Sequence, residues 1–241
     1  MTVAEPRGGD PAPGTPGRSN SATAGLMVQP TLLGWGEPAY DGTFGCLRRT
    51  ELGRGAWVEH QSAWVSGHDE LFARLLDEGD WQATSRTMYD RVVDVPRLLA
   101  PGPRSGPTAE LLGGMADRLS RRYGVVMSQI TMALYRTGAD SVAWHGDRVA
   151  RERLVSLMAT VSLGSPRPFR LRPKGGGASR QLALGAGDLV VMGGTCQRTW
   201  EHAVPKVASA GPRVAVMFRP DWGRGGPSAG PVPADGDGPV S

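Results

Sequence analysis

Residues 188–219, DLVVMGGTCQRTWEHAVPKVASAGPRVAVMFR, contain three short apolar runs separated by segments that are rich in Gly, Pro and Thr. The runs are DLVVMGG (188–194), WEHAV (200–204) and RVAVMFR (213–219). Short runs of Val, Met, Phe and Leu that end at turn-forming residues are typical of β-strands, because helices of a globular domain need longer periodic segments. This stretch therefore predicts β-structure, and the segments on its N-terminal side continue the pattern.

Five more runs of the same kind precede it. They are VVMSQITMALYR (125–136), SVAWH (141–145), LVSLMATVSLG (154–164), PFRLR (168–172) and RQLAL (180–184). Eight short strands with turn signals between them predict a β-sandwich or barrel. The Gly-rich segment PKGGGAS (173–179) lacks the order of a phosphate-binding loop, so we expect a flexible hairpin loop there.

Two helices are expected before these strands. Ser66 and Asp69 resemble an N-terminal cap before LFARLLDE, and Gly79 is placed to end that helix. A second helix is expected from about Thr108 to Tyr123, because apolar residues recur there every four positions. This stripe consists of Leu111, Met115, Leu119 and Tyr123. Helices followed by a run of strands indicate an α+β domain in which N-terminal helices brace a β-core.

The two ends of the chain have a different composition. Residues 1–28 and 223–241 are dominated by Gly, Pro, Ser and Ala, so they are expected to be disordered tails around a folded domain at 29–222. The N-terminal segment has no apolar core of a secretory signal, and no run approaches the length of a membrane span. Length and composition therefore indicate one globular domain with no membrane partner, and a monomer is the default expectation.

Charge and cysteine content limit the possible functions further. The net charge is +4, and Lys174 and Lys206 are the only lysines, so the positive charge is almost entirely arginine. This balance is compatible with nucleic acid or with an ordinary basic surface. Cys46 and Cys196 lie far apart, which argues against a thiolate zinc site and a disulfide framework. A reducing cytoplasm is the compartment that fits best.

A candidate metal site includes two of the four histidines. His145 and Asp147 are two residues apart in a strand-like segment, so both side chains point to the same face, and Gly146 keeps the opposite face small. His202 on a separate strand is available as a third ligand. Two imidazoles and one carboxylate form the facial triad of non-haem Fe(II) enzymes. The alternative is that these histidines are structural, which is the interpretation we adopt for His60 and His68.

The last strand is expected to be buried, with an arginine at each end of one face. Residues 213, 215, 217 and 219 share that face. A buried Arg213 or Arg219 requires an anionic partner, because an unpaired buried charge is very costly. A dicarboxylate co-substrate is one such partner, since arginine binds carboxylates through two parallel hydrogen bonds. The alternative is that each arginine pairs with an internal Asp or Glu.

With these motifs in order, the sequence resembles the AlkB family of Fe(II)/2-oxoglutarate-dependent dioxygenases. The match covers about 120–222 and extends more weakly to about residue 30. It rests on LYRTGAD (134–140), WHGD (144–147), SLG (162–164), WEH (200–202) and the closing Arg213–Arg219 strand. The resemblance implies a double-stranded β-helix (jelly-roll) core. It implies iron at His145, Asp147 and His202, and 2-oxoglutarate at Tyr135, Arg213 and Arg219, with Arg213 on the distal carboxylate.

The resemblance also implies a reaction. It is the oxidative demethylation of N-alkylated bases in DNA, of the 1-methyladenine and 3-methylcytosine type. The reaction uses Fe(II) as its metal and consumes O₂ and 2-oxoglutarate. Succinate, CO₂ and formaldehyde are formed. Three positions depart from the family pattern, since Ala133, Ala215 and Met217 stand where the family has Asn, Asn and Thr. These departures affect co-substrate binding and leave the metal ligands unchanged.

By the same resemblance, the segment WQATSRTMYDRVVDVPR (81–97) covers the target base. Trp81 and Tyr89 are candidates for stacking on an extruded base, and Arg97 and Arg172 are candidates for contacts with bases or phosphates. The alternatives are core packing for the aromatic residues and solvated surface positions for the arginines. Two rival functions stay open: an Fe(II)/2-oxoglutarate hydroxylase acting on RNA, protein or a small molecule, and a non-catalytic jelly roll that binds nucleic acid.

Overall fold

The structure, a computed structural model, describes residue 26 and residues 34–88, 91–146 and 154–221. Its strands are β1 (Ala39–Tyr40), β2 (Arg48–Gly53), β3 (Ala56–Gln61), β4 (Val65–Ser66), β5 (Gln82–Met88), β6 (Arg91–Pro101), β7 (Gln129–Tyr135), β8 (Val142–His145), β9 (Ser156–Gly164), β10 (Arg167–Pro173), β11 (Arg180–Leu184), β12 (Leu189–Gly194), β13 (Trp200–Val204) and β14 (Arg213–Arg219). Its helices are α1 (His68–Glu78), α2 (Gly106–Tyr123) and α3 (Cys196–Thr199). The expected tails fall largely outside these residues, so the domain limits stay a prediction.

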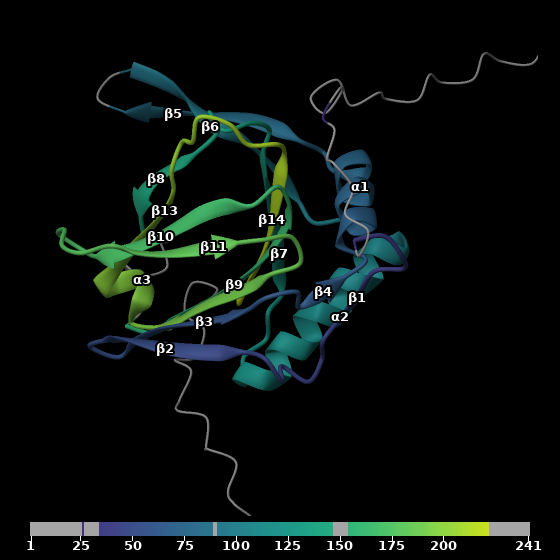
Figure 1. Ribbon diagram of the computed structural model, residues 1–241, viewed down its shortest axis with the longest axis horizontal. Helices are drawn as coiled ribbons and strands as arrows, with labels where there is room; N and C mark the ends of the chain where they lie inside the picture. The colour runs from purple at the N-terminus through teal and green to yellow at the C-terminus, as the bar shows by residue number, and fades with distance from the viewer. Residues whose placement is uncertain (1–25, 27–33, 89–90, 147–153, 222–241) are drawn as a thin grey trace, which may run out of the picture.

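Two antiparallel sheets face each other (Figure 1). The large sheet has the order β2-β3-β12-β9-β14-β7-β6-β5, and the small sheet has the order β11-β10-β13-β8. Neighbouring strands in these orders are often far apart in the chain, as expected for a jelly roll. The expected α+β jelly roll is thus confirmed by the topology.

Apolar side chains from both sheets pack into one cluster between them. We call the side of each sheet that contributes to this cluster its inner face. Its buried members are Ala56, Val58, Ala133, Tyr135, Met158, Phe169, Leu171, Leu184, Val190, Met192, Cys196, Trp200, Val204 and Ala215. The strand period of two explains this set, because β14 contributes Ala215 to the inner face while Val214, Val216 and Phe218 point to the opposite face.

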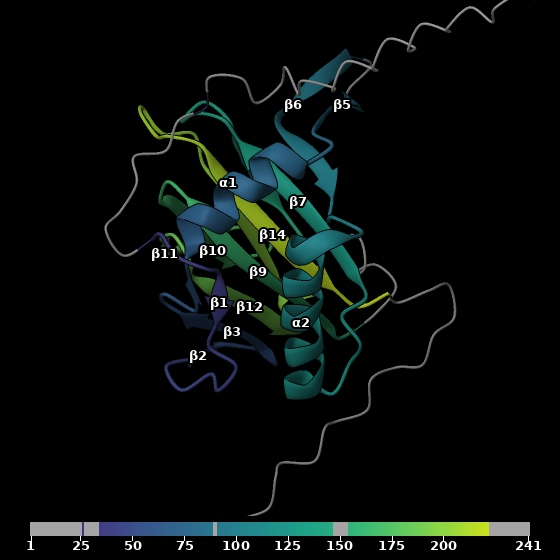
Figure 2. The ribbon, with the colours of Figure 1, turned by 90° about the vertical axis from the view of Figure 1, so that its right-hand side faces the viewer.

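The opposite face of the large sheet is covered by α1 and α2 (Figure 2). Leu71 and Leu75 of α1 and Leu112, Met115 and Leu119 of α2 are fully or almost fully buried against it. α2 ends as expected, since Gly124 adopts the left-handed conformation (φ 64°) that terminates helices. The predicted stripe of α2 is confirmed at Met115 and Leu119, whereas Leu111 and Tyr123 are only partly buried and Leu112 takes a core position that the four-residue spacing did not include.

The start of α1 differs from the expectation. Gly67 occupies the N-cap in a left-handed conformation, with no side-chain cap hydrogen bond, so Ser66 is not the cap. Asp69 instead lies in the first helical turn, where its carboxylate accepts a hydrogen bond from the His68 ring at 3.0 Å. A side chain at position 67 would place its Cβ 2.5 Å from the Gly36 carbonyl oxygen, so close packing reserves this position for glycine.

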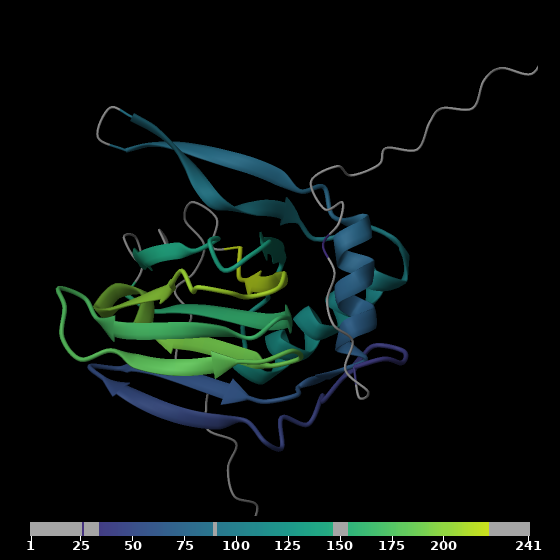
Figure 3. The same cartoon turned by 45° about the horizontal axis from the view of Figure 1, so that its top comes forward.

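All eight expected strands between residues 125 and 219 are present, and six further strands precede them within the described ranges. The long strands β5 and β6 form an arm that rises above the two sheets at the edge of the large sheet (Figure 3). β10 and β11 pair directly around the Gly-rich segment, which confirms the expected hairpin. None of the helices in the described ranges is long and apolar enough to span a membrane.

Candidate metal centre and co-substrate pocket

The two histidines of the expected metal site face each other across the small sheet. His145 ends β8, and His202 lies in the middle of the adjacent β13, where the two residues are register partners. Their ring centroids are 4.2 Å apart. His202 also lies 5.6 Å from the ring of Phe169, an inner-face residue, so the pair is directed between the sheets. Antiparallel pairing is the reason that residues 57 positions apart in the chain meet here.

A backbone contact fixes the tautomer of His145. Its Nδ1 lies 2.8 Å from the carbonyl oxygen of Ala143, and a carbonyl oxygen accepts but never donates a hydrogen bond. Nδ1 must therefore hold the proton, which leaves the lone pair of the neutral ring on Nε2. Metal-binding histidines commonly have this arrangement, in which a backbone oxygen sets ring orientation and tautomer.

Gly146 is required by the packing of β8 against α3. A Cβ atom at this position would lie 2.5 Å from the carbonyl oxygen of Gln197 and 3.6 Å from that of Trp200. Real Cβ atoms essentially never approach other heavy atoms within 3.0 Å, so any side chain would push β8 away from α3. The glycine after His145 thus lets the end of β8 approach α3 and the first residue of β13.

Asp147 lies outside the described residues, so its role as the third ligand stays a prediction. Within the described part of the chain, no group of three or more His, Cys, Asp or Glu side chains is placed to hold a metal ion. The two imidazoles already satisfy two-thirds of a facial triad, and their soft-to-intermediate nitrogen donors suit Fe(II). The donor chemistry of the described pair therefore fits the expected metal.

The second part of the site is a buried arginine beside a tyrosine. Arg213 begins β14, is 2% exposed, and pairs in register with Tyr135 at the end of β7. Its Cζ atom lies 5.2 Å from the centroid of the Tyr135 ring, and its Nε donates to Ser162 Oγ at 2.9 Å. Its Nη1 is buried and has no hydrogen-bond partner among the described residues.

The environment of Arg213 is suited to an anion. Burial lowers the pKa of its guanidinium below the ordinary value, while Tyr135 acts in the opposite direction. No described carboxylate neutralises the charge, so the alternative of an internal Asp or Glu partner is excluded within the described residues. An unpartnered Nη1 in a desolvated site fits the distal carboxylate of 2-oxoglutarate.

Arg219 occupies the opposite end of the same strand face. It is half-buried, and its guanidinium donates to Thr131 Oγ1 at 3.0 Å and to Met217 Sδ at 3.4 Å. The structure thus brings Tyr135 and Arg213 together and places Arg219 six residues further along β14. A direct contact of Arg219 with the co-substrate stays a prediction.

Two of the departures from the family pattern are neighbours in the sheet. Ala215 pairs in register with Ala133 on one side and with Ser162 on the other. Both alanines are buried on the inner face, one row away from Arg213. The polar groups that the family pattern has at these positions are therefore missing from one continuous patch, and Ser162 is the polar side chain that borders it.

The residues expected to contact the base are dispersed. Trp81 is 5% exposed, belongs to the core on the helix side of the large sheet, and donates from Nε1 to the Leu76 carbonyl at 3.3 Å. The expectation that Trp81 stacks on a base is therefore wrong, because its ring is enclosed by core residues. Tyr89 lies outside the described residues. Arg97 is half-buried on β6, and its Nε is buried with no hydrogen-bond partner among the residues that the structure describes.

Arg172 lies on the outer face of the small sheet. Its neighbour Leu171 pairs with His202 on the inner face, so the Arg172 side chain points the other way. There it donates to Glu201 Oε2 from Nε and Nη2, at 3.1 and 3.0 Å, and its Cζ lies 4.3 Å over the Trp144 ring. Arg172 therefore points away from the two histidines, and its contact with a base or phosphate stays a prediction.

Comparison with known proteins identifies the group to which this architecture belongs. Residues 102–219 match the model of the 2OG-Fe(II) oxygenase superfamily. Human alpha-ketoglutarate-dependent dioxygenase alkB homolog 3 is 28% identical over 180 residues, which cover 64% of this chain and 62% of that protein. The chain thus contains a 2OG-Fe(II) oxygenase domain, and its relatives carry the names alkB homolog 3 and ALKBH2.

A second relative and a solved structure with ALKBH names agree with this comparison. Bovine DNA oxidative demethylase ALKBH2 is 30% identical over 176 residues, which cover 63% of each protein. The solved structure of OsALKBH1 aligns with a TM-score of 0.50 and 13% identity over 72% of this chain and all of that one, which supports the fold. The chain spans about three-fifths of the length of the curated AlkB relatives that it matches first.

Sequence reasoning did not single out three inner-face residues that contact the candidate site: Ser162, Phe169 and Arg167. Arg167 is 1% exposed, and its Cζ lies 5.6 Å from the Tyr135 ring centroid. Alternation in RPFRLRP contained a signal for it, because Arg167, Phe169 and Leu171 share one strand face while Arg170 and Arg172 share the other. Burial of the first arginine depends on the facing sheet.

Proposed function

We propose that this protein catalyses the oxidative demethylation of N-alkylated nucleobases in DNA. His145, Asp147 and His202 would hold Fe(II), and Tyr135, Arg213 and Arg219 would hold 2-oxoglutarate. When bound, iron and its co-substrate supply the oxidation of an N-methyl group by O₂, with succinate, CO₂ and formaldehyde as products. The names of the relatives, alpha-ketoglutarate-dependent dioxygenase and DNA oxidative demethylase, support this reaction class.

One observation carries the proposal most directly. The inner faces of the two sheets present a pair of facing imidazoles and, in the same enclosure, a buried arginine with an unpartnered Nη1. A metal alone would require only the imidazoles, and an anion alone would require only the arginine. A co-substrate with a carboxylate at one end and a chelating 2-oxo acid at the other requires both.

The chain's own residues orient the reactants and exclude water. The carbonyl of Ala143 sets the tautomer of His145, and the Arg213 guanidinium is aligned by Ser162 and Tyr135. The remaining inner-face residues between the sheets are apolar, including Phe169, Leu171 and Val190. Such surroundings strengthen the attraction between Arg213 and a carboxylate, because little water is present to screen it.

The substrates that we propose are 1-methyladenine and 3-methylcytosine in DNA. Tyr89 is the proposed stacking partner of the extruded base, and Arg97 is a proposed contact of the nucleic acid. Arg97 precedes Leu98 on β6, and Leu98 pairs with Leu134 of β7. Tyr135 follows Leu134, so this register supports the choice of Arg97. We further propose that the protein acts as a monomer in the cytoplasm, which light scattering and cell fractionation would test.

The reaction can be tested on purified protein with Fe(II), ascorbate, 2-oxoglutarate and oligonucleotides that contain a single methylated base. We expect succinate to form together with loss of the methyl mass in the oligonucleotide. His145→Ala should abolish both signals, whereas His68→Gln, which alters a histidine paired with Asp69 at the start of α1, should retain them. The absence of succinate and of any mass change with the natural protein would refute the proposal.

The same assay separates the rival functions. Succinate formed without a change in DNA, followed by turnover on a methylated RNA, peptide or small molecule, would assign the chemistry to another substrate. Salt-dependent DNA binding by a protein that retains no iron after reconstitution would indicate a non-catalytic binding domain.

A further inference from the structure

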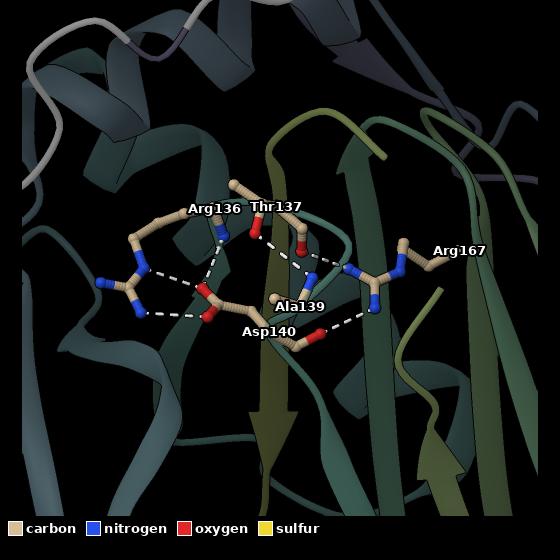
Figure 4. Close-up of polar contacts among 5 residues, drawn as sticks. All are labelled: Arg136, Thr137, Ala139, Asp140 and Arg167. Carbon is tan, nitrogen blue, oxygen red and sulfur yellow. Dashed lines mark hydrogen bonds and ion pairs between the residues drawn. The ribbon is translucent and has the colours of Figure 1, made fainter. Parts of the chain in front are cut away.

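Arg167 is a buried cation whose position is fixed by backbone oxygens. Its Nη1 donates to the Thr137 carbonyl at 3.0 Å, and its Nη2 donates to the Asp140 carbonyl at 2.7 Å (Figure 4). Nη2 also donates to the Pro205 carbonyl at 2.8 Å. These oxygens belong to the loop between β7 and β8 and to the segment after β13. Three contacts from two separate segments leave the guanidinium no freedom to turn toward solvent.

The carboxylate nearest in sequence to these contacts is already engaged elsewhere. Asp140 accepts from Arg136 through Nε at 2.8 Å, Nη2 at 3.0 Å and the backbone N–H at 2.8 Å (Figure 4). The hydrogen bonds of Arg167 therefore go only to backbone carbonyls, which accept hydrogen bonds but carry no net negative charge. Its Nε is buried and has no partner among the described residues. Burial accordingly lowers the pKa of Arg167, although Tyr135 and Asp140 oppose this effect.

Arg167 and Arg213 lie close to the same aromatic ring. Their Cζ atoms are 5.6 and 5.2 Å from the centroid of the Tyr135 ring. Burial lowers the pKa of Arg213, and the positive charge of Arg167 lowers it further. Both are almost fully buried, and neither forms an ion pair within the described part of the chain. Two mutually repelling buried cations are costly unless an anion joins them.

From this arrangement we infer that Arg167 is a second cation of the co-substrate pocket, a positioning residue that favours 2-oxo acids with a distal carboxylate by acting on that carboxylate together with Tyr135 and Arg213. The inference rests on the proposed 2-oxoglutarate site. Arg213 offers the carboxylate a hydrogen-bond donor, Nη1, that has no partner among the described residues. Arg167 contributes a fixed positive charge, because its Nη1 and Nη2 already donate to backbone carbonyls. A charge held rigidly in a desolvated site acts strongly over several ångströms.

The test compares two 2-oxo acids that differ in the distal carboxylate. Binding of 2-oxoglutarate and of 2-oxobutyrate to Mn(II)-loaded protein is measured by calorimetry without O₂, and the ratio of the two affinities is the readout. We expect Arg167→Gln to lower this ratio by about tenfold, as the loss of one nearby charge implies. A purely structural role would weaken both ligands equally or only lower the thermal stability, so an unchanged ratio overturns the inference.

Two further variants complete the design. Arg167→Lys retains the charge but loses the planar fork that contacts three carbonyls, so the ratio should stay within about threefold of the natural value even if the protein is less stable. A ratio as low as that of Arg213→Gln would overturn the inference, and this comparison remains available if Arg167→Gln does not fold. Arg136→Gln, which removes the neighbouring ion pair with Asp140, is the matched control and should leave the ratio unchanged.

The natural protein separates this inference from the proposed function. If it shows no preference for 2-oxoglutarate over 2-oxobutyrate, the co-substrate site itself is refuted, and Arg167 with it. If it prefers 2-oxoglutarate and Arg167→Gln retains that preference, only the role of Arg167 is refuted.

Discussion

His145 and His202 are register partners on adjacent antiparallel strands, and their ring centroids lie 4.2 Å apart. This relationship predicts that both imidazoles are needed for metal affinity, independently of any substrate. We expect His202→Ala to weaken Co(II) binding at least tenfold, because removing one donor leaves an incomplete coordination shell. Titration of the visible absorption of Co(II) would measure it. Co(II) affinity equal to that of the natural protein would show that His202 is not a ligand.

Gly146 allows a test of whether close packing at the end of β8 is needed for metal affinity. Gly146→Ala should reduce metal affinity about tenfold or more, since the added Cβ would meet the Gln197 carbonyl at 2.5 Å and push the end of β8, with His145, away from α3. Gly113→Ala is the matched control, because nothing lies within 4 Å of a Cβ at this helical position. It should leave metal affinity unchanged and stabilise α2 by roughly 0.5–1 kcal/mol. Equal metal affinity of both variants would contradict the packing argument.

Asp188 predicts a pH dependence of stability. Burial opposes ionisation of its carboxyl group, but hydrogen bonds from the His60 ring and the backbone N–H groups of Ala63 and Gly185 outweigh it and lower the pKa. The carboxylate therefore stabilises the fold above about pH 4, the ordinary pKa of an unfolded Asp, and this contribution is lost as the pH falls through the lowered folded value.

The measurement is the free energy of unfolding by urea at several pH values, for the natural protein and for Asp188→Asn. The difference between the two proteins should be largest near neutral pH and should shrink below about pH 4. A difference that stays constant across this range would show that the carboxylate charge of Asp188 contributes nothing.

The two cysteines should differ sharply in reactivity. Cys46 is exposed, whereas Cys196 is buried on α3, which packs against β12 and β13, and burial raises the pKa of its thiol to about 12. Because the thiolate is the reactive form, iodoacetamide at neutral pH should label Cys46 and spare Cys196 in the folded protein. Mass spectrometry of the labelled peptides, with urea-unfolded protein as the control, measures this directly. Equal labelling of both residues in the folded state would contradict the burial of Cys196.

Trp81 tests the correction to the expected base pocket. Trp81→Ala should destabilise the fold by about 3–5 kcal/mol, since it removes a large side chain from the core between α1 and the large sheet. Trp81→Phe should retain most of the stability and the affinity for methylated DNA. A DNA affinity that falls for Trp81→Phe without loss of stability would restore the stacking role.

The sequence by itself determined the strands from residue 125 onward and the order of the site residues along them. Alternation in RVAVMFR separated Arg213 and Ala215 from Val214 and Val216, because a strand turns successive side chains to opposite faces. It also identified the helix-side stripe of α2. These features are local, so periodicity and residue type suffice to predict them.

The strands before residue 102 were not predicted, because their formation depends on partners. β2, RRTELG, is mostly exposed and polar, and β5, QATSRTM, has no apolar alternation. Each is an edge strand that is held mainly by backbone pairing with β3 or β6, and such pairing leaves little mark in side-chain hydrophobicity.

Tertiary structure also decided which charges are buried together. Arg167 and Arg172 stand in one short strand, yet the first is enclosed beside Tyr135 and the second pairs with Glu201 on the outer face. In the sequence alone, all arginines have the same side-chain chemistry, so residue type does not show which of them are buried. Only the facing of the two sheets determined that Arg167 and Arg213 share one desolvated enclosure, because the cost of a buried charge depends on what surrounds it in space and not on its neighbours in the chain.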